Sequence, residues 1–175
     1  VKAGWYDWYG SPYWTDWYHQ TRSQNAITFD GGKGQMVTGY REQLQRNGKI
    51  TGFSAQPGYD YVEGDATAAY GGQLTMARRQ VWHLRNGGGS MLVRDRLAST
   101  VARTYEWNVH TPVIMTVENA QNVKVVAGAQ SVCLRSLNTD AEFAKWIGPG
   151  AKTNVVEDNG AFYLKNDGKS TAEFL

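Results

Sequence analysis

The stretch that decides the fold is residues 79–96, which read RQVWHLRNGGGSMLVRDR. Two runs rich in apolar residues flank a glycine loop at Asn86–Ser90. Glycine takes positive φ values without steric cost, so such a loop can join two antiparallel strands in a tight turn. We therefore predict a β-hairpin in which Arg79–Arg85 pairs with Met91–Arg96.

The same rhythm extends outward from this hairpin in both directions. Short runs rich in Val, Ile, Thr and aromatic residues recur between clusters of Gly, Asn, Asp and Ser, and no window sustains the three- and four-residue apolar spacing of an amphipathic helix. This pattern is typical of an antiparallel β-sandwich, so we predict an all-β chain that forms a single domain over residues 1–175. The predicted strands are Asn25–Phe29, Gln35–Tyr40, Gly48–Ala55, Tyr59–Glu63, Gln73–Arg85, Ser90–Leu97, Ala102–His110, Val113–Glu118, Val123–Ala127, Ser131–Leu137, Asn154–Glu157, Phe162–Lys165 and Thr171–Phe174.

The composition is that of a globular domain and argues against several partners. The chain has 175 residues, is 41% hydrophobic and carries a net charge of +2, with no long run of Lys or Arg, so we expect no nucleic-acid partner. No apolar run reaches about 18 residues, so we expect no membrane span. The single cysteine, Cys133, lies in an apolar stretch and is expected to be buried.

The two ends of the sequence both look cut. The chain opens on Val1 without methionine and stops at Thr171–Leu175 in a β-type alternation with no turn. We therefore expect a segment, truncated at both ends, of a longer protein that is periplasmic or secreted in its full form.

Aromatic side chains are concentrated in the first eighteen residues, which hold eight of the seventeen Trp and Tyr in the chain. Trp and Tyr suit sugar binding because a flat apolar face stacks on the ring while the polar edge forms hydrogen bonds. The alternatives are an aromatic-packed sheet edge or a contact with another domain. The residues predicted for a sugar surface are Trp8, Tyr9, Trp14 and Trp17.

A motif follows at residues 21–35, which read TRSQNAITFDGGKGQ. This stretch resembles the R-S-H-N-x-I-x-x-D-G-x-x-Q signature of the β domain in heparinase II/III-like polysaccharide lyases. Residues 63–70, the runs 78–81 and 93–95, and residues 107–111 resemble the same family more weakly.

The resemblance implies that the chain is the β-sandwich half of an enzyme whose other half is an α/α-toroid domain. Such enzymes cleave uronic-acid polysaccharides, such as heparin, heparan sulfate or alginate, by β-elimination. A base removes the C5 proton beside a carboxylate, whose charge must be offset, and an acid must reach the leaving oxygen. Family members usually take the Tyr acid from the toroid, so we expect this chain alone to bind an acidic polysaccharide without cleaving it, and we expect no cofactor.

Gln24 occupies the motif position that is often His in relatives. Because Gln cannot act as a general base, three alternatives stay open: Gln24 neutralises the uronate, His19 supplies the imidazole, or the position was substituted. The predicted catalytic set is Gln24, His19 and Asn25.

The substrate-binding prediction adds Arg22 and His110 to the four aromatic residues. No spacing among His19, His83 and His110 forms a persuasive zinc set, so no metal site is predicted.

A non-catalytic carbohydrate-binding or scaffold module is the alternative function. Such a module would use Trp8, Trp14 and Trp17 as a stacking platform. It would not require Arg22 and Gln24 close together, whereas a lyase needs such groups around a carboxylate.

Overall fold

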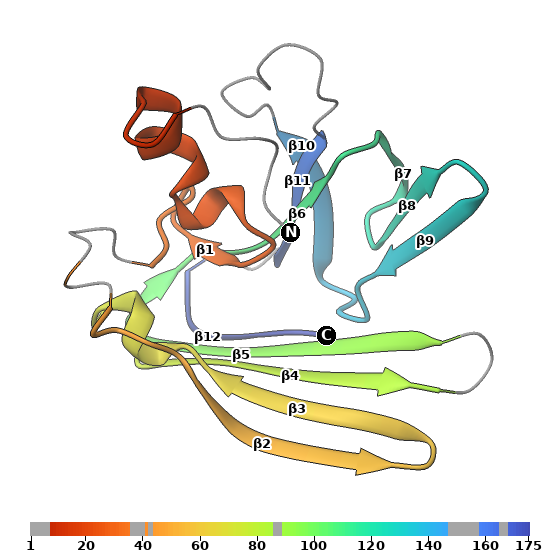
Figure 1. Ribbon diagram of the computed structural model, residues 1–175, viewed down its shortest axis with the longest axis horizontal. Coiled ribbons are helices and arrows are strands. Elements are labelled where there is room, and N and C mark those ends of the chain that lie inside the picture. Colours follow the sequence, from red (N-terminus) through yellow and green to blue (C-terminus); the bar gives the residue numbers. More distant parts are fainter. Residues whose placement is uncertain (1–7, 36–40, 42–43, 86–88, 147–157, 165–167) are drawn as a thin grey trace. The chain divides into compact units, whose positions relative to one another are not determined.

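A computed structural model describes residues 8–35, 41, 44–85, 89–146, 158–164 and 168–175 (Figure 1). These residues form antiparallel strands joined by turns and a few short helical segments. The predicted all-β, antiparallel fold class is therefore confirmed. In the described part of the chain, no helix has the length and apolar character needed to cross a membrane.

The chain divides into two compact units, and each is described by itself. The first combines Val1–Gly34 with Thr104–Asp167, and the second combines Gln35–Arg103 with Gly168–Leu175. That the chain forms a single domain stays a prediction.

The first unit contains two antiparallel sheets and two helical turns. The turns are the π-helix η1 (Trp14–Tyr18) and the 3-10 turn η2 (Thr21–Ser23). In the four-stranded sheet the order is β1 (Ile27–Phe29), β6 (Tyr105–Thr111), β11 (Asp158–Leu164) and β10 (Ala141–Trp146). The three-stranded sheet consists of β7 (Met115–Asn119), β8 (Asn122–Ala127) and β9 (Gln130–Arg135).

One face of the four-stranded sheet is apolar. Successive side chains of a strand point to opposite faces, and directly paired residues share a face. Trp107 on β6 pairs with Ile27 on β1 and with Phe162 on β11, which in turn pairs with Phe143 on β10. The rings of Phe143 and Phe162 meet edge to face at 4.9 Å between centroids, and both side chains are buried. This face supplies the apolar core of the unit.

The second unit contains a five-stranded antiparallel sheet and the 3-10 turn η3 (Thr67–Tyr70). The strand order is β12 (Lys169–Phe174), β5 (Ser90–Arg103), β4 (Met76–Leu84), β3 (Tyr59–Asp65) and β2 (Lys49–Gln56). Strands β4 and β5 pair with Arg79 opposite Asp95 and His83 opposite Met91, so the predicted hairpin pairing is confirmed. Arg79 Nε lies 2.8 Å from the carboxylate of buried Asp95, so these two paired residues form an ion pair on one face of this sheet.

Some sequence expectations differ from the structure. Strand β10 was not predicted, because its sequence AEFAKW is rich in residues that strands disfavour; its pairing with β11 along its whole length holds it in place. Cys133 is exposed, so its predicted burial is wrong: it lies on β9, an edge strand with exposed or half-buried residues throughout. The predicted strand Asn154–Glu157, nearly all of Gln35–Tyr40 and the centre of the Asn86–Ser90 loop lie outside the described residues.

Gly160 on β11 provides a test of the core packing. A Cβ added at this position would lie 2.3 Å from Cζ of Phe143, so the ring has room only because residue 160 lacks a side chain. We expect Gly160→Ala to lower the free energy of unfolding by about 1–3 kcal/mol, measured by thermal or urea denaturation. Gly64→Ala on β3 is the matched control, because its Cβ would meet only Lys49 O at 3.9 Å. Equal losses in the two variants would contradict this account of the Phe143 contact.

Candidate substrate-binding site

The opposite face of the four-stranded sheet carries polar side chains. On β6 these are Glu106, Asn108 and His110, each no more than 4% exposed. The neighbouring strand β11 places Tyr163 opposite Glu106 and Asn159 opposite His110. A buried polar group without a hydrogen-bond partner costs about 1–3 kcal/mol, so this row needs partners from elsewhere in the chain.

The motif at residues 21–35 supplies most of these partners. Thr28 Oγ1 donates to one carboxylate oxygen of Glu106, and the backbone N–H of Gly31 donates to the other at 2.9 Å. The side-chain amide of Asn108 donates to Thr28 Oγ1 at 2.8 Å and to the carbonyl of Ala26 at 3.0 Å. The motif is thus anchored on the polar side of β6.

A tight turn within the motif makes room for Arg22. Phe29 and Lys33 exchange two backbone hydrogen bonds, and the residues between them have positive φ values, including 49° at Asp30 and 97° at Gly32. A Cβ at Gly32 would lie 2.5 Å from Cδ of Arg22. The glycine is required both by its conformation and by the close approach of the arginine stem.

Arg22 is held against an aromatic group of side chains. Its Cζ lies 4.3 Å from the ring centroid of Trp146, within the range of a cation–π interaction. Trp17 packs edge-on against Trp146 at 5.4 Å and against His110 at 6.1 Å, and the rings of His110 and Trp146 meet at 5.5 Å. We call Trp17, Arg22, His110 and Trp146 the Arg22 cluster.

His110 is held at two points within this cluster. Its backbone N–H donates to Asn25 Oδ1 at 2.8 Å, and its Nδ1 lies 2.6 Å from Asn159 Oδ1. Because that amide oxygen is an acceptor, Nδ1 carries the hydrogen in this contact. Burial lowers the pKa of His110, and the contacts with Asn159 and with backbone groups of Arg22 and Gln24 oppose this shift. The ring is therefore neutral at neutral pH.

Several buried polar atoms of the Arg22 cluster lack a hydrogen-bond partner within the described part of the protein. They are Trp17 Nε1, Arg22 Nε, His110 Nε2 and Trp146 Nε1. Buried polar groups are nearly always satisfied in folded proteins, and exceptions are found at functional sites. Four such atoms on contacting side chains therefore mark this cluster as the candidate site.

Comparison of the sequence and the fold with known proteins identifies the family of the chain. The sequence matches the family profile described as Heparinase II/III-like, C-terminal, over residues 1–171. The chain belongs to this family. The resemblance predicted from the motif is thereby confirmed.

Solved structures show the same fold as this heparinase II/III-like domain. They include heparan sulfate lyase HepC from Pedobacter heparinus (TM-score 0.73, 17% identity) and a mutant of it (TM-score 0.74, 15% identity). A heparinase III, the BT4657 gene product with methylated lysines, matches with a TM-score of 0.71 and 12% identity. Each comparison covers 99% of this chain but only 26–27% of the solved chain. No protein with a curated description matches the sequence.

The structure brings one group of the sequence-predicted site residues together. Arg22, Trp17 and His110 belong to the Arg22 cluster, and Asn25 holds the backbone of His110. Trp17 is only 5% exposed and His110 only 2%, so both support the cluster from inside. Arg22 and Trp146 are half-buried, so they are the members of the cluster that reach the surface.

A second group of predicted residues lies in an outer aromatic stack of the heparinase II/III-like domain. Trp14 stacks on His19 with 4.3 Å between ring centroids and 16° between planes, and Tyr9 packs on Trp14 at 4.6 Å. Tyr9 is 75% exposed and Trp8 is 65% exposed. We call Tyr9, Trp14 and His19 the outer stack.

Gln24 is half-buried and engaged with its own neighbours. Its side-chain amide donates to the carbonyl of Tyr18 at 3.2 Å and to Ser23 Oγ at 2.9 Å. Both amide hydrogens are therefore used inside the protein, and only Oε1 is left for a further contact. A role for Gln24 in neutralising a carboxylate would require its amide to exchange these bonds, and that role stays a prediction.

Sequence reasoning missed two residues that complete the site. Trp146 lies on the unpredicted strand β10, and Asn159 lies on β11 before the start of the strand predicted there. The aromatic residue in the alternating AEFAKW segment was the available signal for Trp146. No group of three His, Cys, Asp or Glu side chains suited to a metal ion occurs in the described ranges.

The lowered pKa of His110 predicts an acid-dependent loss of stability. Above the unfolded-state pKa of about 6.5 the ring is neutral in both states, and below it the unfolded chain takes up the proton first. Stability is thus fully present above about pH 6.5 and is lost as the pH falls through the lower folded-state value. We expect the melting temperature of the wild type to approach that of His110→Gln between about pH 8 and 5, measured by calorimetry. A constant difference between the two proteins over this range would rule out a buried neutral His110.

Proposed function

We propose that this chain is the β-sandwich portion of a polysaccharide lyase that cleaves a uronic-acid polysaccharide, such as heparin, heparan sulfate or alginate, by β-elimination. The family membership and the fold of the heparan sulfate lyases support this proposal. The chain spans about 27% of the length of these solved enzymes, so an α/α-toroid domain of the same protein is proposed as the other half of the cleft. A periplasmic or secreted location is part of the proposal.

The observation that carries the proposal is the placement of Arg22. Its side chain is half-buried, rests on Trp146 and has a buried Nε with no hydrogen-bond partner in the described parts of the chain. An arginine fork matches a carboxylate in two parallel hydrogen bonds, which are stronger when partly removed from water. Holding the uronate carboxylate in this way offsets its charge and favours loss of the neighbouring C5 proton.

His110 supports the same chemistry from inside the cluster. Burial lowers the pKa of His110, so its ring is neutral at neutral pH, and it packs edge-on against Trp17 and Trp146. We assign His110 to the orientation of Trp17 and Trp146, the second of which carries Arg22. Because Gln24 cannot act as a base, two candidates for the base are the imidazole of His19 and a side chain of the toroid.

The proposal predicts that this chain binds an acidic oligosaccharide but does not cleave it, because the tyrosine acid is expected from the toroid. Binding is measured by calorimetric titration with a heparin-derived oligosaccharide, and cleavage by ultraviolet absorbance of the unsaturated uronate product. We expect Arg22→Gln to weaken binding about ten- to hundred-fold through loss of a charged hydrogen bond. Arg96→Gln is the matched control, since Arg96 is an exposed arginine of β5 in the other compact unit.

Two outcomes would contradict this assignment. Steady product formation by the chain alone, free of contaminating lyase, would show that catalysis does not need a second half. Equal affinities for Arg22→Gln and Arg96→Gln would show that the Arg22 cluster does not hold the substrate.

A non-catalytic carbohydrate-binding module is the second candidate, and the outer stack favours it. Exposed Tyr9 and half-buried Trp14 and His19 pack ring against ring, and Trp8, which precedes Tyr9 in the chain, is also exposed. Such aromatic faces bind sugars without a base or an acid. Sugar binding that depends on the outer stack and not on Arg22 would favour this function.

Burial predicts different results for two tryptophans near the N-terminus. We expect Trp17→Ala to lower the free energy of unfolding by about 3–5 kcal/mol, because this side chain is 5% exposed. Trp8→Ala should leave stability within about 0.5 kcal/mol and weaken oligosaccharide binding several-fold if the exposed ring contacts sugar. Calorimetric melting and binding titration on both variants provide the measurements. A large stability loss for Trp8→Ala with unchanged affinity would assign this ring to packing.

A further inference from the structure

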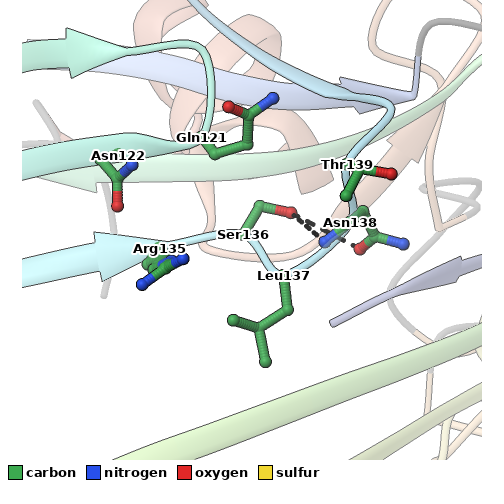
Figure 2. Close-up of a pocket in the computed structure, with 7 residues that line it drawn as sticks. All are labelled: Gln121, Asn122, Arg135, Ser136, Leu137, Asn138 and Thr139. Carbon is green, nitrogen blue, oxygen red and sulfur yellow. Dashed lines mark hydrogen bonds between the residues drawn. The ribbon is translucent and has the colours of Figure 1, made fainter.

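A polar pocket lies in the first compact unit, at one end of the three-stranded sheet. Figure 2 shows the residues that line it, which come from two short segments: Gln121, Asn122, Arg135, Ser136, Leu137, Asn138 and Thr139. Its volume is about 240 Å³. No residue of the Arg22 cluster lines it, so it is a separate feature of the surface.

The walls of the pocket are held in place by the protein. The backbone N–H of Ser136 donates to Gln121 O at 2.9 Å, and the side-chain amide of Gln121 donates to Ala141 O at 2.8 Å. Asn122 pairs with Arg135 across β8 and β9, so these side chains stand on the same face. Figure 2 shows Ser136 Oγ bonded to Asn138, which fixes the start of the segment that leaves β9. A preformed pocket loses little entropy when a ligand binds.

The side chains that line the pocket favour a polar ligand with a negative charge. Six of the seven residues are polar, and they combine amides and hydroxyls with one guanidinium. No carboxylate lines the pocket, and exposed Arg135 has no ion-pair partner among the residues that the structure describes. Neutral amides and hydroxyls exchange hydrogen bonds with sugar hydroxyls, and an arginine binds a carboxylate or sulfate in a forked geometry.

The size of the pocket limits the ligand to a small unit. Pockets for drug-sized ligands measure roughly 300–1,000 Å³, which is above the 240 Å³ here. One sugar ring with a single anionic substituent is small enough for this volume and matches the hydrogen-bonding groups and the arginine of the lining. We propose that this pocket is an accessory subsite that binds one anionic sugar unit, a uronate or a sulfated hexosamine, away from the Arg22 cluster. This binding requires no catalytic activity and no second domain.

The test is an NMR titration of the isotopically labelled chain with small probes. The probes are methyl β-glucuronide, N-acetylglucosamine 6-sulfate, neutral methyl β-glucoside and inorganic sulfate. We expect saturable shifts of the backbone amides at residues 121–122 and 135–139 with one or both anionic sugars. The tighter of the two identifies the preferred anion. Arg135→Gln should weaken this binding about ten-fold or more, while Arg96→Gln should leave it unchanged.

Several results would overturn the proposal. These are the absence of saturable shifts at the pocket, equal binding of the neutral glucoside, equal binding of inorganic sulfate, and unchanged affinity in Arg135→Gln. Thr139→Ala adds a second variant at an exposed lining residue and should weaken sugar binding without changing the rest of the spectrum. The NMR readout is limited to the backbone amides at residues 121–122 and 135–139. A negative result there would therefore overturn the subsite without affecting the outcome of the oligosaccharide titration with Arg22→Gln.

Discussion

The alternation of side chains along β6 is the constraint on which the site depends. Trp107 and its neighbours in register place aromatic rings on one face of the four-stranded sheet, and Glu106, Asn108 and His110 point to the other. A shift of one residue in the pairing would exchange the two faces and bury the charged and polar set in the apolar core. The close fit of Phe143 over Gly160 restricts the neighbouring β10–β11 register in the same way, because the ring has room only where residue 160 lacks a side chain.

The buried polar row explains why the motif has its particular form. Thr28 and the backbone of Gly31 are needed as donors to Glu106, and Asn25 is needed as an acceptor for His110. These contacts position the preceding turn η2, which carries Arg22 over Trp146. The motif that resembles a catalytic signature thus also has a structural role. The same hydrogen bonds that pair the buried polar groups of β6 also orient Arg22.

The aromatic segment near the N-terminus is divided between two environments by its helical turn. Trp14 and Trp17 lie three residues apart on the π-helix η1, and Trp14 joins the outer stack while Trp17 lies in the Arg22 cluster. Three residues make less than a full turn of a π-helix, so the two side chains leave η1 in different directions. The predicted sugar surface therefore contains both packing residues and exposed rings.

The sequence by itself determined the fold class, the β4–β5 pairing and the family, because alternation, turn residues and a contiguous motif are local signals. The motif also placed Arg22, Gln24 and Asn25 next to one another in the chain. Only the tertiary structure decided that Trp146 lies under Arg22, that Asn159 holds His110 and that Cys133 is exposed. These facts depend on pairings between strands distant in sequence, such as β6 with β11 and β10 with β11. Register across a sheet is a property of the packed chain, and no local pattern in the AEFAKW segment specifies which residue it will meet.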